Sequence, residues 1–454
     1  MALRPRLVVV GGDAAGMSAA AQARRRRSED ELDIVCFERG PYTSYAACGI
    51  PYFVGDLVHD AAELVARTPD EHRRRGLDVR TGHEVVAIDT EQSSVRVRDL
   101  AAGDESDEPY DQLVIATGAT PVRPPIPGID ARGIFGVQSL ADGIAVRAAV
   151  EAGGARRAVV VGGGYIGLEL AEAMLLRGLD VALVEGAAQP MNTLDPDMGS
   201  LIADALRGMG VSLHLDAMVD AFDVVDGAVR GVHAGGEMLP ADLVVLGLGV
   251  RPRSALADDA GIVIGPTGGI AVDDHQRTSV EGVFAAGDCV ETFHRVSRRP
   301  VAIALGTHAN KQGRVVGLNA TGGDATFPGV IGTAISKICK VEVARTGLNE
   351  READEAGFDA VAATIEGSTR AHYYPGSMPI HVKVVAERGR GRILGAQIVG
   401  EEGAAKRVDV LAAAIWTEMT AEEFSSLDLA YAPPFSPVWD PVLIAARRAA
   451  EAAA

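Results

Sequence analysis

The sequence predicts an α/β protein with two similar parallel-sheet units followed by a C-terminal α+β unit. An apolar strand, a glycine-rich turn and a helix follow one another near residue 10, and the same order recurs near residue 160. From Thr326 onward no such turn occurs, and short apolar strands alternate with helices instead. A chain of 454 residues is also too long for one hydrophobic core and indicates roughly two to four domains.

Composition limits the classes of partner. The chain has 43 Lys and Arg against 62 Asp and Glu, a formal net charge of −19. Nucleic acids and anionic membranes attract cationic surfaces, so neither is expected as a partner. A hydrophobic content of 47% indicates a packed globular protein, and no apolar run approaches the length of a membrane span. The four scattered cysteines, Cys36, Cys48, Cys289 and Cys339, predict neither a disulfide framework nor a metal site, which fits a reducing cytoplasm.

The first strand, turn and helix predict a site for the pyrophosphate of a dinucleotide. The apolar run Leu7 to Val10 precedes a glycine-rich turn and an Ala-rich helix that continues to about Arg27. Glycines allow a tight turn and close approach of the backbone, while the helix N-terminus supplies N–H donors and positive dipole. A second strand ends at Glu38, twenty-two residues after Gly16, where a carboxylate can bind a ribose diol. The predicted cofactor residues of this unit are Gly11, Gly12, Asp13, Ala14, Ala15, Gly16, Glu38 and Arg39.

The same motif recurs after the strand Ala158 to Val161, and its following strand ends at Glu185. Two dinucleotide-binding, Rossmann-like units in one chain predict one FAD and one nicotinamide dinucleotide. Small residues follow Glu185, with no Arg or Lys to bind a 2′-phosphate, and its carboxylate would repel that phosphate. NADH is therefore predicted over NADPH. The predicted cofactor residues of this unit are Gly162, Gly164, Tyr165, Ile166, Gly167, Glu169 and Glu185.

Two further strand ends complete the predicted flavin site. One strand ends in the turn after Ala116, and another ends at an acid whose geometry suits a ribityl hydroxyl. The residues concerned are Ala116, Thr117, Gly118 and Asp288. The predicted domains are an FAD-binding domain (1–120 and 250–323), an NAD(H)-binding domain (121–249) and a C-terminal α+β domain (324–454). The Ala- and Arg-rich tail from Ala445 is expected to be a frayed helix.

One cysteine stands out by its position rather than by a motif. Cys48 lies in the stretch Ser44 to Tyr52 (SYAACGIPY), a few residues after the second strand of the flavin unit. Thr43 and Phe53, five positions to either side, are not cysteines, so a local dithiol is excluded. An isolated cysteine is more often a small buried hydrophobe, but these surroundings favour a redox centre.

With these features placed, the chain resembles the pyridine nucleotide-disulfide oxidoreductases. The resemblance is strongest to the single-cysteine branch, which includes coenzyme A-disulfide reductases, NADH oxidases and persulfide reductases. The segments SYAACGIPY, GTHANKQGR, HYYPG and LAYAPPFSPVWDP are most similar to coenzyme A-disulfide reductases. The resemblance implies a three-layer fold like that of glutathione reductase, with FAD and NADH as cofactors. It also implies a homodimer in which the C-terminal dimerisation domain completes the partner's active site.

The resemblance implies that electrons pass from NADH through the flavin to sulfur on Cys48. A cysteine at the start of a short helix beside an oxidised flavin is expected to have a lowered thiol pKa. Without a resolving cysteine nearby, oxidised Cys48 forms either a mixed disulfide with a small thiol or a sulfenic acid. The first outcome gives disulfide or persulfide reduction, and the second gives oxygen or peroxide chemistry. Cys36 and Cys339 are expected to be inert core residues.

The resemblance also assigns roles to individual residues. The substrate residues that it implies are Ser18, Gln22, Arg25, Ser44 and His308. Tyr373 and Tyr431 would assist the departing thiolate, since a phenol can hydrogen-bond or protonate sulfur. Tyr165 is expected over the flavin where nicotinamide enters, and Glu169 near the flavin edge. Two alternatives stay open: favourable charge at a helix C-terminus as the only role of Arg24 to Arg27, and a packed core or interface phenol at Tyr431.

Several positions depart from the pattern of coenzyme A-disulfide reductases. Ala47 stands where many relatives have Asn, Gly76 where a basic residue is expected, and Trp439 where a substrate Lys is found. Coenzyme A disulfide, a persulfide or another small thiol therefore stay open as substrates. Ala14 replaces the His of NADH oxidases and peroxidases, so oxygen chemistry lacks its usual acid–base partner. An NADH oxidase is the alternative function, and a flavin-based redox sensor a third.

Overall fold

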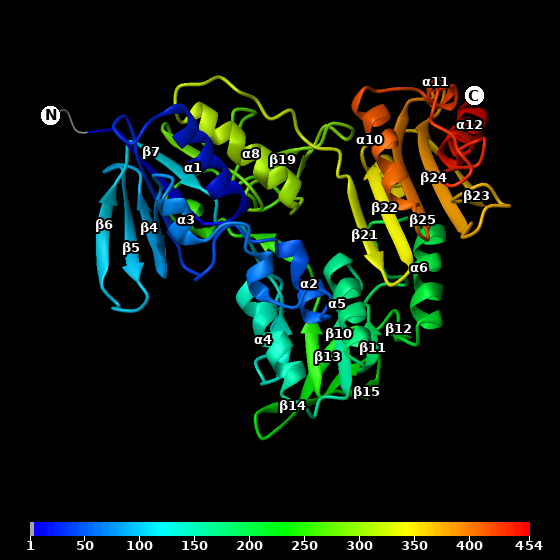
Figure 1. Cartoon of the computed structure of the whole chain (residues 1–454), viewed down its shortest axis with the longest axis horizontal. Helices are drawn as coiled ribbons and strands as arrows, with labels where there is room; N and C mark the ends of the chain where they lie inside the picture. The colour runs from blue at the N-terminus through cyan, green and yellow to red at the C-terminus, as the bar shows by residue number, and fades with distance from the viewer. Residues whose placement is uncertain (1–3) are drawn as a thin grey trace.

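The computed structural model describes residues 4–454 and contains three five-stranded sheets (Figure 1). The first sheet has the order β18-β7-β1-β2-β3 and is parallel throughout. Its strands are β1 (Arg6–Val10), β2 (Asp33–Glu38), β3 (Asp78–Thr81), β7 (Gln112–Ile115) and β18 (Val283–Ala285). Helices α1 (Ala14–Arg26) and α8 (Gly306–Asn319) pack against each other. The antiparallel sheet β4 (His83–Asp89), β5 (Ser94–Asp99) and β6 (Glu105–Pro109) is added to this unit.

The second sheet repeats this plan with the order β12-β11-β10-β16-β9. Its strands are β9 (Ile134–Gly136), β10 (Arg157–Val161), β11 (Asp180–Val184), β12 (Ser212–His214) and β16 (Leu243–Leu246). The helices of this unit are α4 (Leu140–Glu151), α5 (Tyr165–Leu176) and α6 (Pro196–Gly208). An antiparallel sheet of β13 (Val219–Val225), β14 (Ala228–Ala234) and β15 (Glu237–Pro240) belongs to it. The chain enters and leaves through the antiparallel pair β8 (Ala119–Pro121) and β17 (Val250–Pro252).

The third sheet is antiparallel, with the order β21-β22-β25-β24-β23. Its strands are β21 (Ala334–Ile338), β22 (Val341–Gly347), β23 (Ala360–Ser368), β24 (Pro379–Glu387) and β25 (Ile393–Gly400). The helices α9 (Glu350–Glu355), α10 (Val408–Trp416), α11 (Ala421–Ser425) and α12 (Pro441–Ala453) belong to this unit. The α/β class with a C-terminal α+β unit is therefore confirmed. None of the helices between residues 4 and 454 is both long and apolar enough to cross a membrane.

Two expectations about the C-terminal unit are wrong. The tail is not frayed, because α12 packs on β23 and β24 and fully buries Ala445, Ala446 and Ala449. Small alanine side chains on one face let the helix lie close to the sheet. Cys339 is not in the core: it is only partly buried, in the turn between β21 and β22, with a left-handed φ of 53°.

A buried ion-pair cluster joins the second and third units. The ammonium of Lys383 on β24 lies 3.2 Å from Asp195 and 2.8 Å from Asp197, which begin helix α6. Gln397 on β25 donates from Nε2 to Asp195 Oδ2 over 2.5 Å. Because Lys383 and Asp195 are almost fully buried, this contact fixes α6 against the C-terminal sheet.

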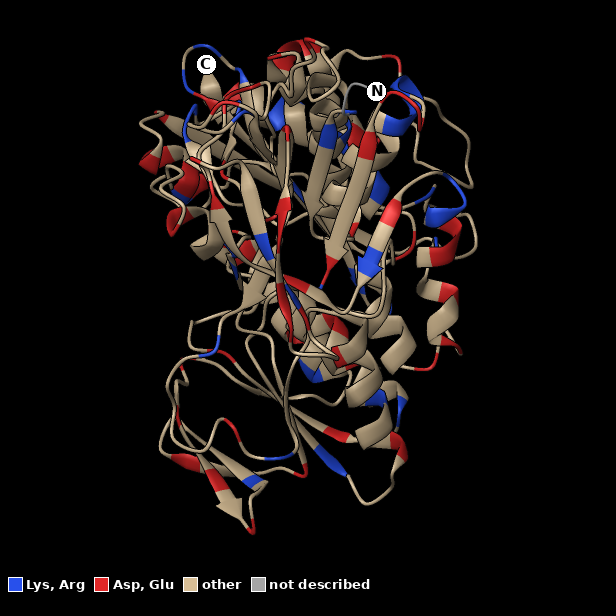
Figure 2. Ribbon diagram, turned by 90° about the vertical axis from the view of Figure 1, so that its left-hand side faces the viewer, with Lys and Arg blue, Asp and Glu red and all other residues tan. Residues whose placement is uncertain are grey.

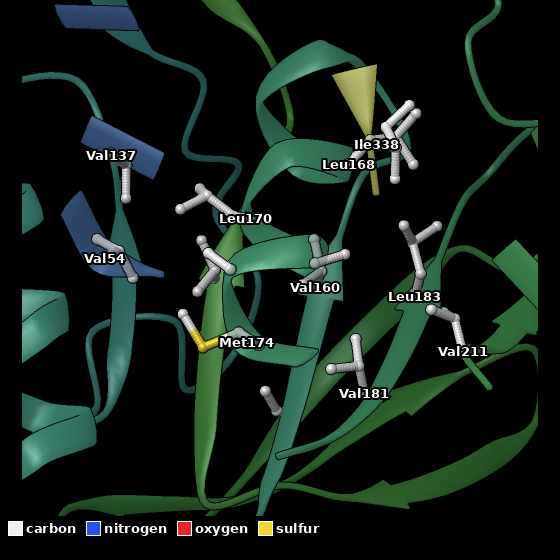
Figure 3. Close-up of a cluster of buried hydrophobic side chains, with 14 of the residues drawn as sticks. Val54, Val137, Val160, Leu168, Leu170, Met174, Val181, Leu183, Val211 and Ile338 are labelled. Carbon is white, nitrogen blue, oxygen red and sulfur yellow. The ribbon is translucent and has the colours of Figure 1, made fainter. Parts of the chain in front are cut away.

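One of the two largest apolar cores, drawn in part in Figure 3, combines side chains of all three units. It contains side chains of β10, β11 and α5, and the C-terminal unit contributes Ile338. The short helix α2 (Ile50–Val54) also inserts Ile50, Phe53 and Val54 into this core. Although α2 belongs to the first unit in sequence, it packs against α4 and α5 of the second (Figure 1).

Close packing and one arginine fix α2 in this place. A Cβ at Gly143 of α4 would lie only 2.5 Å from the Cγ2 methyl of Ile50, so a larger residue there would have to displace the Ile50 side chain. Arg147 of α4 donates to the Phe53 carbonyl over 2.9 Å, and its guanidinium lies 4.6 Å from the Phe53 ring centre. The position of the segment just before α2 is therefore set by the second unit.

Replacing Phe53 by Ala should destabilise the protein by about 3–5 kcal/mol, because the ring leaves a cavity in the shared core. Leu57, from the same segment, is 58% exposed, so Leu57→Ala should change stability by less than about 0.5 kcal/mol. Thermal unfolding followed by circular dichroism measures both. Equal midpoints for the two variants would contradict this account of α2.

Candidate active site

The first glycine turn has the geometry of a dinucleotide cradle. Gly11 has a φ of 109°, and a Cβ there would overlap the carbonyl oxygen of Ala116. A Cβ at Gly16 would overlap the Gly11 carbonyl oxygen. The Gly12 N–H donates to Glu38 Oε2 over 2.7 Å. The turn therefore admits only glycine at these points and holds the Glu38 carboxylate beside it.

The second turn repeats this geometry. Gly162 has a φ of 102°, and a Cβ at Gly167 would overlap the Gly162 carbonyl oxygen. The Gly163 N–H donates to Glu185 Oε2 over 2.7 Å, as Gly12 does to Glu38. The cofactor residues predicted from sequence do not include Gly163. Its position in the second glycine turn matches that of Gly12 in the first, and this match would have indicated it.

The helices that follow both turns begin without a side-chain cap. Neither α1 nor α5 has a capping hydrogen bond or an acidic residue in its first turn. In contrast, α3 (Pro69–Arg73), α4, α9 and α11 each begin with a capping box. The N–H groups of α1 and α5 therefore stay available for phosphate oxygens. These residues fit two bound dinucleotides.

The remaining predicted flavin residues lie around the first turn, with differing exposure. Burial raises the pKa of Asp13 and of Asp288 to about 6, as expected for carboxyls held in a closed cofactor site. Thr117 Oγ1 donates to the Arg253 carbonyl over 2.6 Å. Arg39, in contrast, is exposed and only 3.9 Å from Glu84. Cys289 is fully buried with its Sγ 3.3 Å from the Ala286 carbonyl oxygen.

Cys48 lies in the 3₁₀ turn Ala47–Gly49, directly before α2, and its side chain is exposed. The lowered thiol pKa that is expected beside an oxidised flavin stays a prediction for the FAD-loaded protein. Desolvation by surrounding protein atoms and the nearby carboxylates of Glu169 and Asp288 raise the pKa of the thiol. These carboxylates come from the second nucleotide unit and from the predicted flavin site, so Cys48 lies where the two meet.

Glu169 and Tyr165 both belong to α5. Ser336 of β21 donates to Glu169 Oε1 over 2.8 Å, and burial raises the pKa of this carboxyl. The Tyr165 phenol oxygen is buried and has no hydrogen-bond partner within residues 4–454. Burial raises its pKa as well. Ile166, the next predicted cofactor residue, is partly exposed.

The predicted substrate residues fall into separate groups. Arg25 donates from Nη2 to the Gln22 amide oxygen over 2.8 Å. Ser18, one turn earlier on α1, instead bonds Asn310 of α8 over 2.7 Å. His308 begins the same helix α8, and burial lowers its pKa to about 4.

Ser44 Oγ lies 3.0 Å from Nε2 of His72 on α3. Sequence reasoning missed His72, because nothing local connects the two positions.

A cationic cavity of about 180 Å³ lies beside α1. Its lining residues are Ala21, Arg24, Arg25, Arg67, His72, Arg75 and Leu77. Arg24 is committed to backbone carbonyls, such as that of Leu32 at 2.8 Å. Arg67 and Arg75 donate no side-chain hydrogen bond and form no ion pair within residues 4–454. The sequence showed Arg75 only as a neighbour of Gly76, and it did not indicate Arg67.

Tyr373 and Tyr431 are neighbours on the C-terminal unit, 67% and 46% exposed. The Tyr373 phenol raises the pKa of Tyr431. No hydrogen bond within residues 4–454 joins either tyrosine to Cys48 or its segment.

Comparison with protein families matches residues 5–313 to pyridine nucleotide-disulphide oxidoreductase and residues 333–441 to the dimerisation domain of that family. The chain belongs to the pyridine nucleotide-disulphide oxidoreductase family. It is therefore an NAD(P)H-dependent oxidoreductase.

Individual relatives are similar to this protein over nearly its whole length. An NAD(P)H sulfur oxidoreductase (CoA-dependent) of Pyrococcus abyssi is 40% identical over 97% of each chain. An NADH oxidase of Methanocaldococcus jannaschii is 35% identical over 98% of each chain. The solved structure of a NAD-dependent persulfide reductase from A. fulgidus is 41% identical, with a TM-score of 0.94, covering 98% of this chain and 83% of that one.

If carboxylates set the thiol pKa in this oxidoreductase, replacing Glu169 by Gln should lower the pKa of Cys48. Removing one negative charge favours the thiolate, so alkylation by iodoacetamide at a pH below the thiol pKa should become several-fold faster. The pH profile of Cys48 alkylation in the reduced protein, read by mass spectrometry, measures this. Glu172→Gln, which removes a carboxylate from the next turn of α5, should have a smaller effect. An unchanged profile for Glu169→Gln would show that this carboxylate does not control the thiol.

Proposed function

We propose that this protein is an FAD-dependent NADH oxidoreductase that reduces a low-molecular-mass disulfide through Cys48. Coenzyme A disulfide, or a related persulfide or polysulfide, is the substrate class. The observation that carries this proposal is one exposed cysteine between two dinucleotide cradles, linked through Ser44 and His72 to a cationic cavity. The similarity to a CoA-dependent sulfur oxidoreductase and a persulfide reductase supports it.

The two cradles would hold different cofactors. The turn at Gly11, Gly12 and Gly16, together with Glu38 and Asp288, would hold FAD. The turn at Gly162, Gly164 and Gly167, together with Glu185, would hold NADH. When bound, these cofactors supply the electron pair that reduces sulfur on Cys48.

The chemistry at Cys48 balances with two thiols as products. The Cys48 thiolate attacks one sulfur of the disulfide R–S–S–R, which forms Cys48–S–S–R and releases R–S⁻. A phenol such as Tyr431 of the partner subunit can donate a proton to this leaving group. The electron pair then cleaves the mixed disulfide, which restores the Cys48 thiolate and releases the second thiol. The sum is NADH, one proton and one disulfide giving NAD⁺ and two thiols.

The cavity suits the phosphates of coenzyme A. The guanidinium groups of Arg67 and Arg75 have no partner in the described part of the chain, and phosphates bind guanidinium groups strongly. Acidic and basic residues are interspersed along the ribbon shown in Figure 2. Arg75 supplies a charge next to Gly76, where relatives carry their basic residue. At Trp439, which replaces a substrate Lys, the guanidinium of Arg447 lies 5.5 Å from the ring centre.

The functional unit in this proposal is a cytoplasmic homodimer. The segment with Tyr431 also exposes Phe435, Val438 and Trp439, and apolar side chains that face water together favour burial by a partner. The match to a dimerisation domain over residues 333–441 supports this. A partner's C-terminal unit would then bring Tyr373 and Tyr431 to the Cys48 site.

The alternative function is an NADH oxidase, in which Cys48 would cycle through a sulfenate. The similarity to an NADH oxidase favours it. Against it, Ala14 provides no acid–base group beside the flavin. A flavin redox sensor, the third possibility, would show slow turnover with every electron acceptor.

The deciding assay adds NADH and coenzyme A disulfide to the anaerobic protein and counts free thiols. Two thiols should appear for each NADH consumed, and Cys48→Ser should reduce this turnover by at least about 10³-fold, since it removes the nucleophile. Cys36→Ser is the matched control, because burial raises the pKa of that thiol to about 12. Oxygen consumption without thiol release would instead identify an oxidase, and full turnover by Cys48→Ser would refute the proposal.

Loss of a cavity arginine should weaken binding of the coenzyme A nucleotide. We expect Arg67→Ala and Arg75→Ala each to raise KM for coenzyme A disulfide about tenfold, the scale of one charge-assisted hydrogen bond. Competition by 3′,5′-ADP should weaken in parallel. Arg74→Ala is the control, since this arginine is adjacent in sequence but does not line the cavity. If all three variants raised KM equally, the arginines would act through the overall charge of this region and not through contacts in the cavity.

NADH should be strongly preferred over NADPH. Both oxygens of Glu185 accept backbone N–H groups, from Gly163 and Ala187, which holds the carboxylate at the adenosine ribose. We expect kcat/KM for NADH to exceed that for NADPH by about 10²-fold or more, because the 2′-phosphate meets this negative charge. Glu185→Gln should reduce the preference for NADH, mainly because kcat/KM for NADPH increases. Similar kcat/KM values for both cofactors in the unmodified protein would contradict this assignment.

A further inference from the structure

His72 is a buried histidine that reaches the segment of the nucleophile. It is 1% exposed and lies on α3, whose capping box at Thr68 and Glu71 fixes the start of the helix. Its Nε2 lies 3.0 Å from Ser44 Oγ, four residues before Cys48. The same imidazole forms part of the wall of the cationic cavity.

Ser44 is held in an unusual conformation. Its φ of 46° lies in the left-handed region, which costs a non-glycine residue energy unless its surroundings enforce it. Its N–H donates to the Gly12 carbonyl over 3.1 Å, and its carbonyl accepts from Ala66 over 2.8 Å. The backbone of Ser44 is therefore fixed between the first glycine turn and the loop before α3, and His72 fixes its side chain.

The surroundings of His72 determine where its proton lies. Burial and the charges of Arg67 and Arg75 lower its pKa to about 4, so the ring is neutral at neutral pH and carries one N–H. Nδ1 is buried without a hydrogen-bond partner within residues 4–454. A proton on Nδ1 would leave an unpaired N–H near two cations, while a proton on Nε2 donates to Ser44 Oγ. The Ser44 oxygen then acts as acceptor, and its own hydrogen is free for another acceptor.

We propose that His72 is a positioning residue for substrate reduction: it orients the Ser44 hydroxyl so that its hydrogen is donated to the bound disulfide beside Cys48. This inference rests on the proposed function. A ligand in the cavity and the hydroxyl of Ser44 then touch opposite parts of one rigid ring.

A double-mutant cycle tests the proposal in the complete, flavin-loaded protein with NADH and coenzyme A disulfide. His72→Phe and Ser44→Ala should each lower kcat/KM about tenfold, the scale of one hydrogen bond. Because His72 acts through Ser44, the double variant should be no worse than either single one. His72→Gln, whose amide can still donate to Ser44, should stay within about threefold of the unmodified protein.

Flavin absorbance and the thermal midpoint show whether each variant is folded. If His72→Phe loses its flavin, His72→Asn replaces it in the cycle, because its amide is too short to reach Ser44.

Independent losses that multiply to about a hundredfold in the double variant would overturn the role of His72 and leave the proposed function intact. Equal losses in His72→Gln and His72→Phe would overturn it as well. Absence of thiol release by the unmodified protein would instead refute the proposed function, and this inference with it.

Discussion

The structure depends on the insertion of α2 into the core of the second nucleotide unit. Ile50, Phe53 and Val54 are buried there, and they immediately follow the turn that carries Cys48. Apolar burial of this size contributes several kcal/mol, so the thiol cannot change its distance from α5 without exposing the core. This packing explains how Glu169, which belongs to the second unit, comes close enough to raise the pKa of the Cys48 thiol.

The electrostatics on the two sides of the nucleophile are opposite. Glu169, Asp288 and Asp13 surround the thiol with negative charge, while Arg67 and Arg75 form a cationic wall around the nearby cavity. The electrostatic potential therefore changes sign between the thiol and the cavity.

The glycine turns and their acids could be predicted because they are local patterns: Gly11, Gly16 and Glu38 lie within one strand–helix–strand segment. The surroundings of the Cys48 thiol could not be predicted in this way. Desolvation by the fold, and then the carboxylates of Glu169 and Asp288 more than a hundred positions away, raise the pKa of this thiol in the protein. The contact of His72 with Ser44 also depends on the tertiary fold. The packing of α12 was missed because an Ala- and Arg-rich composition does not show which face meets a sheet.

The pairing of β8 with β17 has a consequence for how this architecture can be rearranged. Both ends of the second unit lie side by side in this two-stranded ribbon, so the unit is an insertion whose two covalent connections are adjacent. A homologous segment could be exchanged there without altering the connectivity of the flavin unit. Such a chimera would have to preserve the surface at Gly143 and Arg147 that receives α2. The surface that contacts α2 therefore limits which homologous units can replace this one.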